Sequence, residues 1–278
     1  FSVATNSCLN APATSGLHPL VIFTPGFTAT FTDYTFLTED LASRGYIVAS
    51  VAHTYETTAL ELPDGRLVRS VVGSHLDGTL QGDDRTMEFA VRVRLQDLRF
   101  VLSELARMNL QPDSPLAGRL DMSNVAVAGH SLGALTALLG VQLDSGVRAA
   151  ILLDGAIPAD LVRPTATPVL ILAAGREQWD ADECGLWSNL QGSRLAVNLR
   201  NTEHVALSDW IWLAKDAIVT GPMGAEKTMS AVRDYVAAFL DSNLRGGHAN
   251  PLLAGPSVDY PDAAVTPQSG SLCAAPKE

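Results

Sequence analysis

Short apolar runs alternate with longer helix-like stretches along this chain. The apolar runs have the length of buried strands and cover residues 20–23, 46–51, 125–128, 149–153, 169–172 and 195–199. The longer stretches predict helices over residues 35–44, 85–108, 132–143 and 226–240. This alternation is typical of a mostly parallel sheet flanked by helices. We therefore predict an α/β fold, in a single domain over residues 1–278, because no repeat or linker interrupts the pattern.

Both ends of the chain and two long connections stand outside this alternation. Residues 1–17 and 246–278 are polar or rich in Gly, Pro and Ala, and we expect both to lie along the surface. The connections 53–84 and 204–224 are longer than ordinary loops. Both follow strands at the expected carboxyl edge of the sheet, where open α/β sheets bind ligands. Whether 53–84 and 205–224 form a lid is a question that the pattern leaves open.

The composition excludes several classes of protein. Of the 278 residues, 47% are hydrophobic, which is ample for a core. The 30 acidic residues outnumber the 19 Lys and Arg and give a formal net charge of −11, so we expect no nucleic-acid partner. No apolar run reaches the roughly 18 residues that a membrane helix needs, so we expect no membrane span.

The start of the chain and its cysteines bear on the compartment. The chain begins at Phe1 without an initiator Met, as a secreted protein does after its targeting segment is removed, so we expect an extracellular location. Cys8, Cys184 and Cys273 lack metal-ligand spacing, and we expect no metal ion. In a secreted chain a bond between Cys8 and Cys273 would tie both ends to the body. Three reduced thiols are the alternative.

One motif indicates nucleophilic chemistry. The apolar run 125–128 leads into Gly129-His-Ser-Leu-Gly133, and a predicted helix follows at once. This is the Gly-x-Ser-x-Gly elbow in a strand–turn–helix setting, where the glycines make room for a sharp turn. The start of the helix favours negative charge near the serine. We therefore predict that Ser131 is a nucleophile.

A nucleophilic serine needs a base, and His204 is the best candidate among six histidines. It follows the last predicted strand, and the chain order Ser, acid, His is the order of the α/β-hydrolase fold. His130, inside the elbow, should point away from the site. The remaining histidines are interpreted as core or surface residues and lie at positions 18, 53, 75 and 248.

The acid that orients His204 has several candidates. Asp154 stands directly at the end of the strand 149–153, so its position is rigid, and a buried carboxylate there would fix the imidazole tautomer. Glu177, Asp180 and Asp182 follow the next strand, in a charged stretch that is more typical of a solvated helix face. Position alone favours Asp154 and leaves the other three open.

The developing oxyanion needs two amide donors. The first is the amide of Leu132, directly after the nucleophile. The second is expected from the turn Phe23-Thr-Pro-Gly-Phe27, where Gly26 lets the backbone approach and Phe27 supplies the amide. Losing one such donor costs roughly 3 to 4 kcal/mol of transition-state stabilisation.

Taken together, these residues resemble the plasma platelet-activating-factor acetylhydrolase family of the α/β-hydrolase superfamily. The resemblance extends from Pro19 to about Trp212 and rests on Pro19–Phe23 with its Gly-Phe turn, Asp40–Ala49, Gly129–Gly133, Asp154-Gly, and His204 before aromatic residues. It implies an α/β-hydrolase fold and assigns the acid to Asp154. It also implies hydrolysis of short acyl esters without a metal or other cofactor.

We therefore predict a secreted serine esterase that acts on small-molecule, acetyl-type esters through an acyl-enzyme. A lipase or polyester hydrolase of the same fold is the alternative, and a non-catalytic binding protein is a third hypothesis. The stretch Trp210-Ile-Trp-Leu213 is either a core helix or an apolar wall that gives weak contact with a lipid surface. Helical spacing favours the core.

Overall fold

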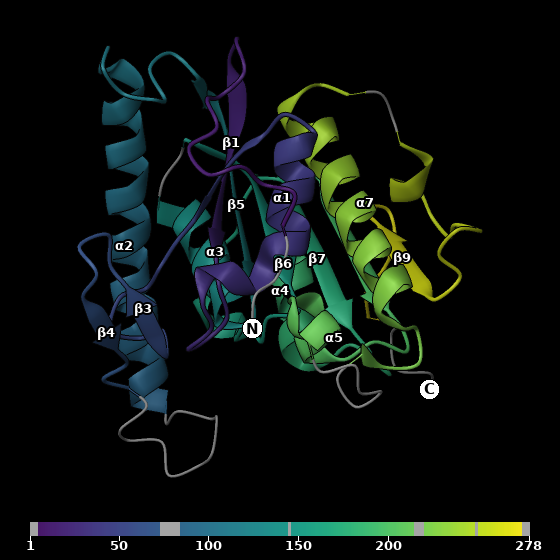
Figure 1. Cartoon of the computed structure of the whole chain (residues 1–278). Helices are drawn as coiled ribbons and strands as arrows, with labels where there is room; N and C mark the ends of the chain where they lie inside the picture. Colours follow the sequence, from purple (N-terminus) through teal and green to yellow (C-terminus); the bar gives the residue numbers. More distant parts are fainter. Residues whose placement is uncertain (1–4, 73–83, 144–145, 214–219, 248–249, 274–278) are drawn as a thin grey trace, which may run out of the picture.

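A seven-stranded sheet forms the centre of the molecule (Figure 1). The computed structural model describes residues 5–72, 84–143, 146–213, 220–247 and 250–273. The strands lie in the order β2-β1-β5-β6-β7-β8-β9 and all pair in parallel except β9. Their bounds are β1 His18–Thr24, β2 Ile47–Ser50, β5 Leu120–His130, β6 Val147–Leu153, β7 Val169–Ala174, β8 Arg194–Leu199 and β9 Ala263–Pro267. The six predicted strands are confirmed.

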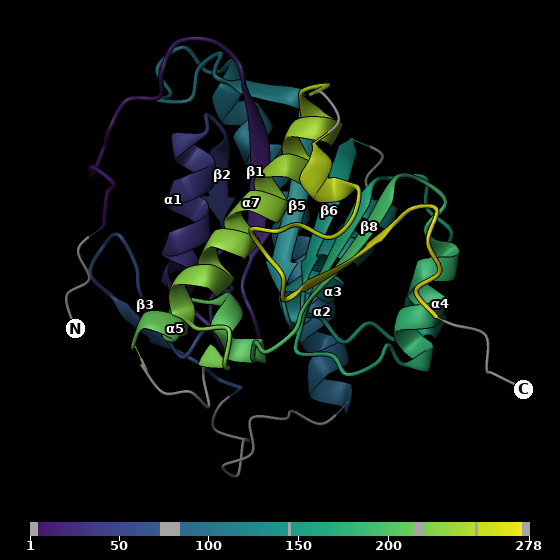
Figure 2. The same cartoon turned by 90° about the vertical axis from the view of Figure 1, so that its right-hand side faces the viewer.

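Helices cover both faces of this sheet (Figures 1 and 2). Side chains alternate between the two faces along a strand. Val21 and Ala128 therefore pack in one buried cluster with Tyr235 of α7, whereas the neighbouring Val127 packs with Leu138 of α3. The bounds are α1 Thr35–Ser43 and α7 Ala225–Leu244 on the first face, and α2 Asp84–Leu110, α3 Leu132–Leu143 and α4 Ala181–Asn189 on the second.

The strand order places a switch point between β1 and β5. From β1 the chain continues to β2 on one side, and β5 joins β1 on the other side before the sheet grows through β6 and β7. Phe23 of β1 is in register with Ala128 of β5, so both strands end at the same edge. A crevice at the carboxyl ends of such strands is the usual ligand site of an open α/β sheet.

The carboxyl-terminal segment departs from the prediction. Part of 246–278, which we expected to lie along the surface, forms β9, and Ala264 to Thr266 pair antiparallel with β8 at the edge of the sheet. This strand brings Cys273 to α4, where it forms a disulfide with Cys184. Of the possibilities that the sequence left open, neither the Cys8–Cys273 bond nor three reduced thiols is present, and Cys8 is an exposed free thiol.

The two long connections contain short elements at the carboxyl edge. β3 Ala59–Glu61 and β4 Leu67–Arg69 form an antiparallel hairpin in the first. The second contains the 3-10 turn η4 His204–Leu207 and the short helix α5 Trp210–Leu213. Elsewhere in the described chain, 3-10 turns are present at η1 Phe31–Tyr34, η3 Ala159–Leu161 and η5 Pro251–Leu253. Residues 73–83 and 214–219, and with them His75, lie outside the described residues, as does His248, so the question of a lid stays open.

Candidate active site

The elbow lies between β5 and α3, and its glycines are required by close packing. Ser131 has a φ of 56°, in the left-handed region that strained nucleophile turns occupy. A methyl group at Gly133 would overlap the carbonyl oxygen of Thr24 in β1, and one at Gly129 would overlap Gly133. The predicted strand–turn–helix setting of Ser131 is thus present at the switch point of the sheet.

Asp154 stands at the end of the neighbouring strand β6. Its amide donates to the Leu172 carbonyl at 2.7 Å, and the Ser131 amide donates to the Leu153 carbonyl at 2.9 Å, so the sheet itself fixes both residues. The Asp154 carboxylate is buried. Like Ser131, Asp154 has a positive φ, of 46°. The chain therefore adopts an unfavourable backbone conformation at both positions that we predicted to be functional.

His204 begins η4 and contacts the acid directly. Its Nδ1 lies 2.5 Å from Asp154 Oδ2. A carboxylate can only accept a hydrogen bond, so Nδ1 carries the proton and Nε2 is left free to accept one. The His204 side chain is 48% exposed, so the ring is open to solvent. In the described part of the chain no hydrogen bond joins the Ser131 hydroxyl to His204; such contacts often tighten only with substrate bound.

Charged neighbours keep the buried Asp154 ionised. Burial opposes its ionisation, but the hydrogen bond from His204, the charge of Arg176 and the amide of Ala174 outweigh burial and hold the pKa of Asp154 below its usual value. The Arg176 guanidinium lies 2.9 Å from Asp154 Oδ1 and also bonds Glu183 at 2.8 Å. Sequence reasoning missed Arg176, which begins the charged stretch that we interpreted as a solvated helix face.

The alternative acids have other roles. Asp180 is the N-cap of α4 and accepts the Glu183 amide at 2.8 Å, while the Glu183 side chain returns to the Asp180 amide. Asp182 accepts the amide of Ala159. The stretch after β7 is thus a turn and a capping box, and Asp154 is the carboxylate that the structure brings to His204.

The turn after β1 lies against the elbow. A methyl group at Gly26 would lie 3.6 Å from Ser131 Cβ. The Gly26 amide donates to the Tyr34 hydroxyl at 2.9 Å, whereas the Phe27 amide has no hydrogen-bond partner among the described residues. Leu132 is the first residue of α3, so its amide is one of the donors that a helix leaves unpaired. Both predicted oxyanion donors, the amides of Phe27 and Leu132, therefore belong to segments that lie next to Ser131.

His130 does not point away from the site, contrary to expectation. It ends β5 on the sheet face where Tyr34 lies, and its ring packs 4.5 Å from the His204 ring. Its Nδ1 lies 2.9 Å from the Tyr34 hydroxyl and its Nε2 lies 3.0 Å from the His204 carbonyl oxygen. Burial lowers the pKa of His130 to about 3, so the ring is neutral. It joins the turn after β1 to the loop that carries His204.

The aromatic stretch after His204 is divided between core and surface. Ile211 is buried, while Trp210 and Trp212 are 51% and 45% exposed. The core interpretation holds for one side of α5 only. Tyr55, also exposed, follows β2 at the same edge of the sheet, and Trp187 is a core residue of α4.

The described residues form neither a metal cluster nor a membrane-spanning helix. They include no group of three or more His, Cys, Asp or Glu placed to hold a metal ion. None of the helices they form is both long enough and apolar enough to cross a membrane.

A parallel sheet with a nucleophile elbow at its switch point, and an acid and a histidine on later strand ends, defines the α/β-hydrolase fold. The chain belongs to the family described as platelet-activating factor acetylhydrolase, isoform II, whose model matches residues 1–62 and 106–245.

Curated relatives carry names of the same family, and a solved esterase structure is similar to this chain over most of its length. A probable 1-alkyl-2-acetylglycerophosphocholine esterase of Arthroderma benhamiae is 24% identical over 269 residues, covering 88% of this chain and 65% of the relative. A platelet-activating factor acetylhydrolase of Cavia porcellus is 30% identical over 55% of this chain, which spans only 38% of that protein. The structure of a ferulic acid esterase from Streptomyces cinnamoneus superposes with a TM-score of 0.77 and 32% identity, over 91% of this chain and 74% of that one.

Proposed function

We propose that this protein is a serine esterase that hydrolyses short-chain, acetyl-type carboxylic esters. The observation that carries the proposal is the contact of His204 Nδ1 with Asp154 Oδ2 beside the strained Ser131 elbow. Ser131, Asp154 and His204 would then be the nucleophile, the buried acid and the oriented base, and they follow three strands of one sheet, β5, β6 and β8. The family membership and the esterase names of the relatives support the same class of reaction.

The chemistry follows from the roles of these groups. Ser131 Oγ attacks the acyl carbon while His204 Nε2 takes the hydroxyl proton, and Asp154 stabilises the imidazolium that forms. The amides of Phe27 and Leu132 bind the tetrahedral oxyanion. The C–O bond to the alcohol then breaks, and His204 returns the proton to the leaving oxygen. Water, activated by His204, hydrolyses the acyl-enzyme and regenerates Ser131.

The size of the acyl group separates this proposal from its alternatives. The name of the Arthroderma benhamiae relative points to an ester whose acyl group is acetyl. The name of the ferulic acid esterase points to an ester with a bulky aromatic acyl group. The exposed Tyr55 and Trp210 at the edge of the sheet are suited to contact with an aromatic ring. An aromatic acyl ester is therefore the second candidate, beside a lipase or polyester hydrolase of the same fold.

A panel of esters tests the proposal. We would compare kcat/KM for p-nitrophenyl esters from acetyl to dodecanoyl with that for methyl ferulate and an acetylated phospholipid. We expect the acetyl and propionyl esters to be the best substrates. A rate that rises beyond about C8 would favour the lipase, and a preference for ferulate would favour the aromatic acyl pocket.

The disulfide and the exposed aromatic residues bear on where the protein acts. The Cys184–Cys273 bond supports an oxidising, extracellular location, because such bonds rarely persist in the cytosol. The exposed Trp210 and Trp212 support weak contact with a lipid surface. Vesicle flotation of the wild-type protein and of Trp210→Ser would test that contact, and we expect the substitution to weaken it.

A further inference from the structure

A buried guanidinium lies behind the turn that carries the predicted oxyanion donor. Arg94 of α2 is 1% exposed, and each of its five N–H groups donates a hydrogen bond. Two go to the Glu56 carboxylate, one to the Thr24 hydroxyl, one to the Pro25 carbonyl and one to the Gly26 carbonyl. Burying a charged group costs several kcal/mol, so full pairing is needed to offset that cost.

The two carbonyl contacts fix the direction of the amides that follow them. The Pro25 oxygen lies 2.7 Å from Arg94 Nη1, and the Gly26 oxygen lies 2.9 Å from Nη2. In a planar trans peptide the N–H points opposite to the C=O. The Gly26 amide therefore points away from Arg94, and it meets the Tyr34 hydroxyl there. By the same geometry the Phe27 amide points away from Arg94. Gly26 itself borders the nucleophile, because a methyl group there would lie 3.6 Å from Ser131 Cβ.

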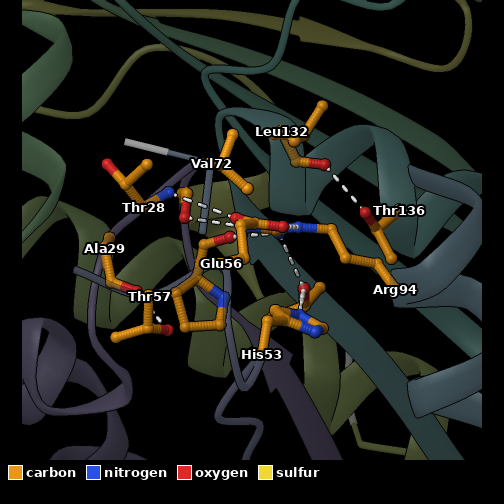
Figure 3. A network of polar contacts seen from close by, with 12 residues as sticks. Thr28, Ala29, His53, Glu56, Thr57, Val72, Arg94, Leu132 and Thr136 are labelled. Carbon is orange, nitrogen blue, oxygen red and sulfur yellow. Dashed lines mark hydrogen bonds and ion pairs between the residues drawn. The ribbon is translucent and has the colours of Figure 1, made fainter. Parts of the chain in front are cut away.

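Glu56 extends this support along the turn. Besides binding Arg94, its carboxylate accepts the Thr28 amide at 3.2 Å, as Figure 3 shows. Thr28 has a φ of 59°, a left-handed conformation that a threonine rarely adopts without support. Thr57 and Thr58 add hydrogen bonds to the Ala29 and Thr28 carbonyls. The chain on both sides of Phe27 is thus held by Arg94 of α2 and by the loop after β2.

His53 completes the network and is satisfied within it. Its Nδ1 donates to Asp97 at 2.8 Å, so its Nε2 accepts from the Thr24 hydroxyl at 2.8 Å. That hydroxyl in turn accepts from Arg94. Burial lowers the pKa of His53, although the Asp97 hydrogen bond opposes the shift. His53 therefore acts as a fixed acceptor in this network, beside the turn.

From this arrangement we infer that Arg94 is a positioning residue for the oxyanion hole. It holds the Gly26–Phe27 peptide in the orientation that presents the Phe27 amide to the substrate. The inference rests on the proposed serine-esterase function. The family match does not include it, because Arg94 lies between the two matched segments, 1–62 and 106–245. Without Arg94 the peptide can rotate, the carbonyl can take the place of the amide, and one oxyanion donor is lost.

The test removes the guanidinium while keeping the site neutral. Arg94→Met alone leaves the buried Glu56 carboxylate without its counterion, so the primary variant is Arg94→Met with Glu56→Gln. Arg94→Lys is the second variant, because it keeps the charge but offers three donors on one nitrogen, so it cannot repeat the five bonds of the planar guanidinium. Arg107→Met is the matched control on the same helix, since Arg107 is exposed and its side chain bonds Glu104 alone among the residues that the structure describes.

The readouts are kcat and KM for p-nitrophenyl acetate, the inhibition constant of a trifluoromethyl ketone and the thermal midpoint. The ketone forms a reversible adduct with Ser131 that places an oxyanion in the hole. We expect kcat to fall about 100-fold or more with KM within about threefold, because a single oxyanion donor is worth this much. The inhibition constant should rise by a similar factor. Arg107→Met should match the wild type.

Three results would overturn the inference. The first is a folded double variant with kcat within about threefold of wild type. The second is a variant that loses stability while its folded fraction binds the ketone as the wild type does, which would make Arg94 purely structural. If the double variant does not fold, Arg94→Lys decides, and wild-type kcat in that variant counts against the inference. A wild-type protein without esterase activity refutes the proposed function instead.

Discussion

Replacing Asp154 with Asn keeps the shape of the side chain and removes what His204 needs from it. The carboxylate accepts from His204, from the Ala174 amide and from Arg176. If the oxygen of the substituted Asn keeps the hydrogen bonds from the Ala174 amide and Arg176, the NH₂ group of the same side chain faces His204 Nδ1. The imidazole must then carry its proton on Nε2, the nitrogen that has to accept the serine proton.

The expected loss follows from that tautomer. A triad aspartate replaced by Asn elsewhere costs about 10⁴ in kcat, which corresponds to about 5 kcal/mol of transition-state stabilisation. We expect the same loss here in steady-state assays with p-nitrophenyl acetate, with KM little changed. Far-UV circular dichroism checks that the variant is folded.

The matched control for this prediction is Asp180→Asn. Asp180 caps α4 and does not contact His204, so the substitution should leave kcat unchanged and cost at most about 1 kcal/mol of stability. The reasoning is refuted if Asp154→Asn retains kcat within tenfold of wild type. It is also refuted if Asp180→Asn loses orders of magnitude.

Two further predictions concern the surroundings of the site. Arg176→Met removes a cation that lowers the Asp154 pKa, so the stabilisation from the ionised carboxylate shrinks. That stabilisation is present above the pKa of Asp154 in the unfolded chain and is lost as the pH falls. Urea unfolding should therefore show the variant about 2 kcal/mol less stable than the wild type at pH 7. The difference between the two proteins should be smaller at pH 3. A difference that grows on acidification would contradict this. Cys273→Ser opens the bond to Cys184 and should cost about 2–4 kcal/mol in the same assay with kcat unchanged, while Cys8→Ser changes neither.

The sequence was sufficient to predict the parallel sheet and the elbow. Buried parallel strands read as continuous apolar runs, and the glycines around Ser131 are needed at fixed positions because α3 and β1 approach the turn closely. Asp154 was favoured because it directly follows such a run, and the family resemblance was needed to choose it over the other acids. In each of these cases the signal is local in the chain.

The parts that were missed depend on contacts between distant segments. β9 is a short stretch in a Pro-rich tail, and its pairing with β8 is what brings Cys273 to Cys184. The Arg94 network joins α2 to two loops, and no local pattern encodes those contacts. One signal was nevertheless available: the apolar Ala90 and Leu98 stand four residues before and after Arg94, so all three share one side of the helix. In the structure that side is buried.

The most direct test of the account is covalent labelling of Ser131. The wild-type protein would be treated with a p-nitrophenyl alkylphosphonate, and the adduct located by mass spectrometry of its peptides. We predict one phosphonyl group, on Ser131, with stoichiometric release of p-nitrophenol and loss of esterase activity. Ser131→Ala should take up no label. A wild-type protein that remains unlabelled, or a label that persists in Ser131→Ala, would contradict the account.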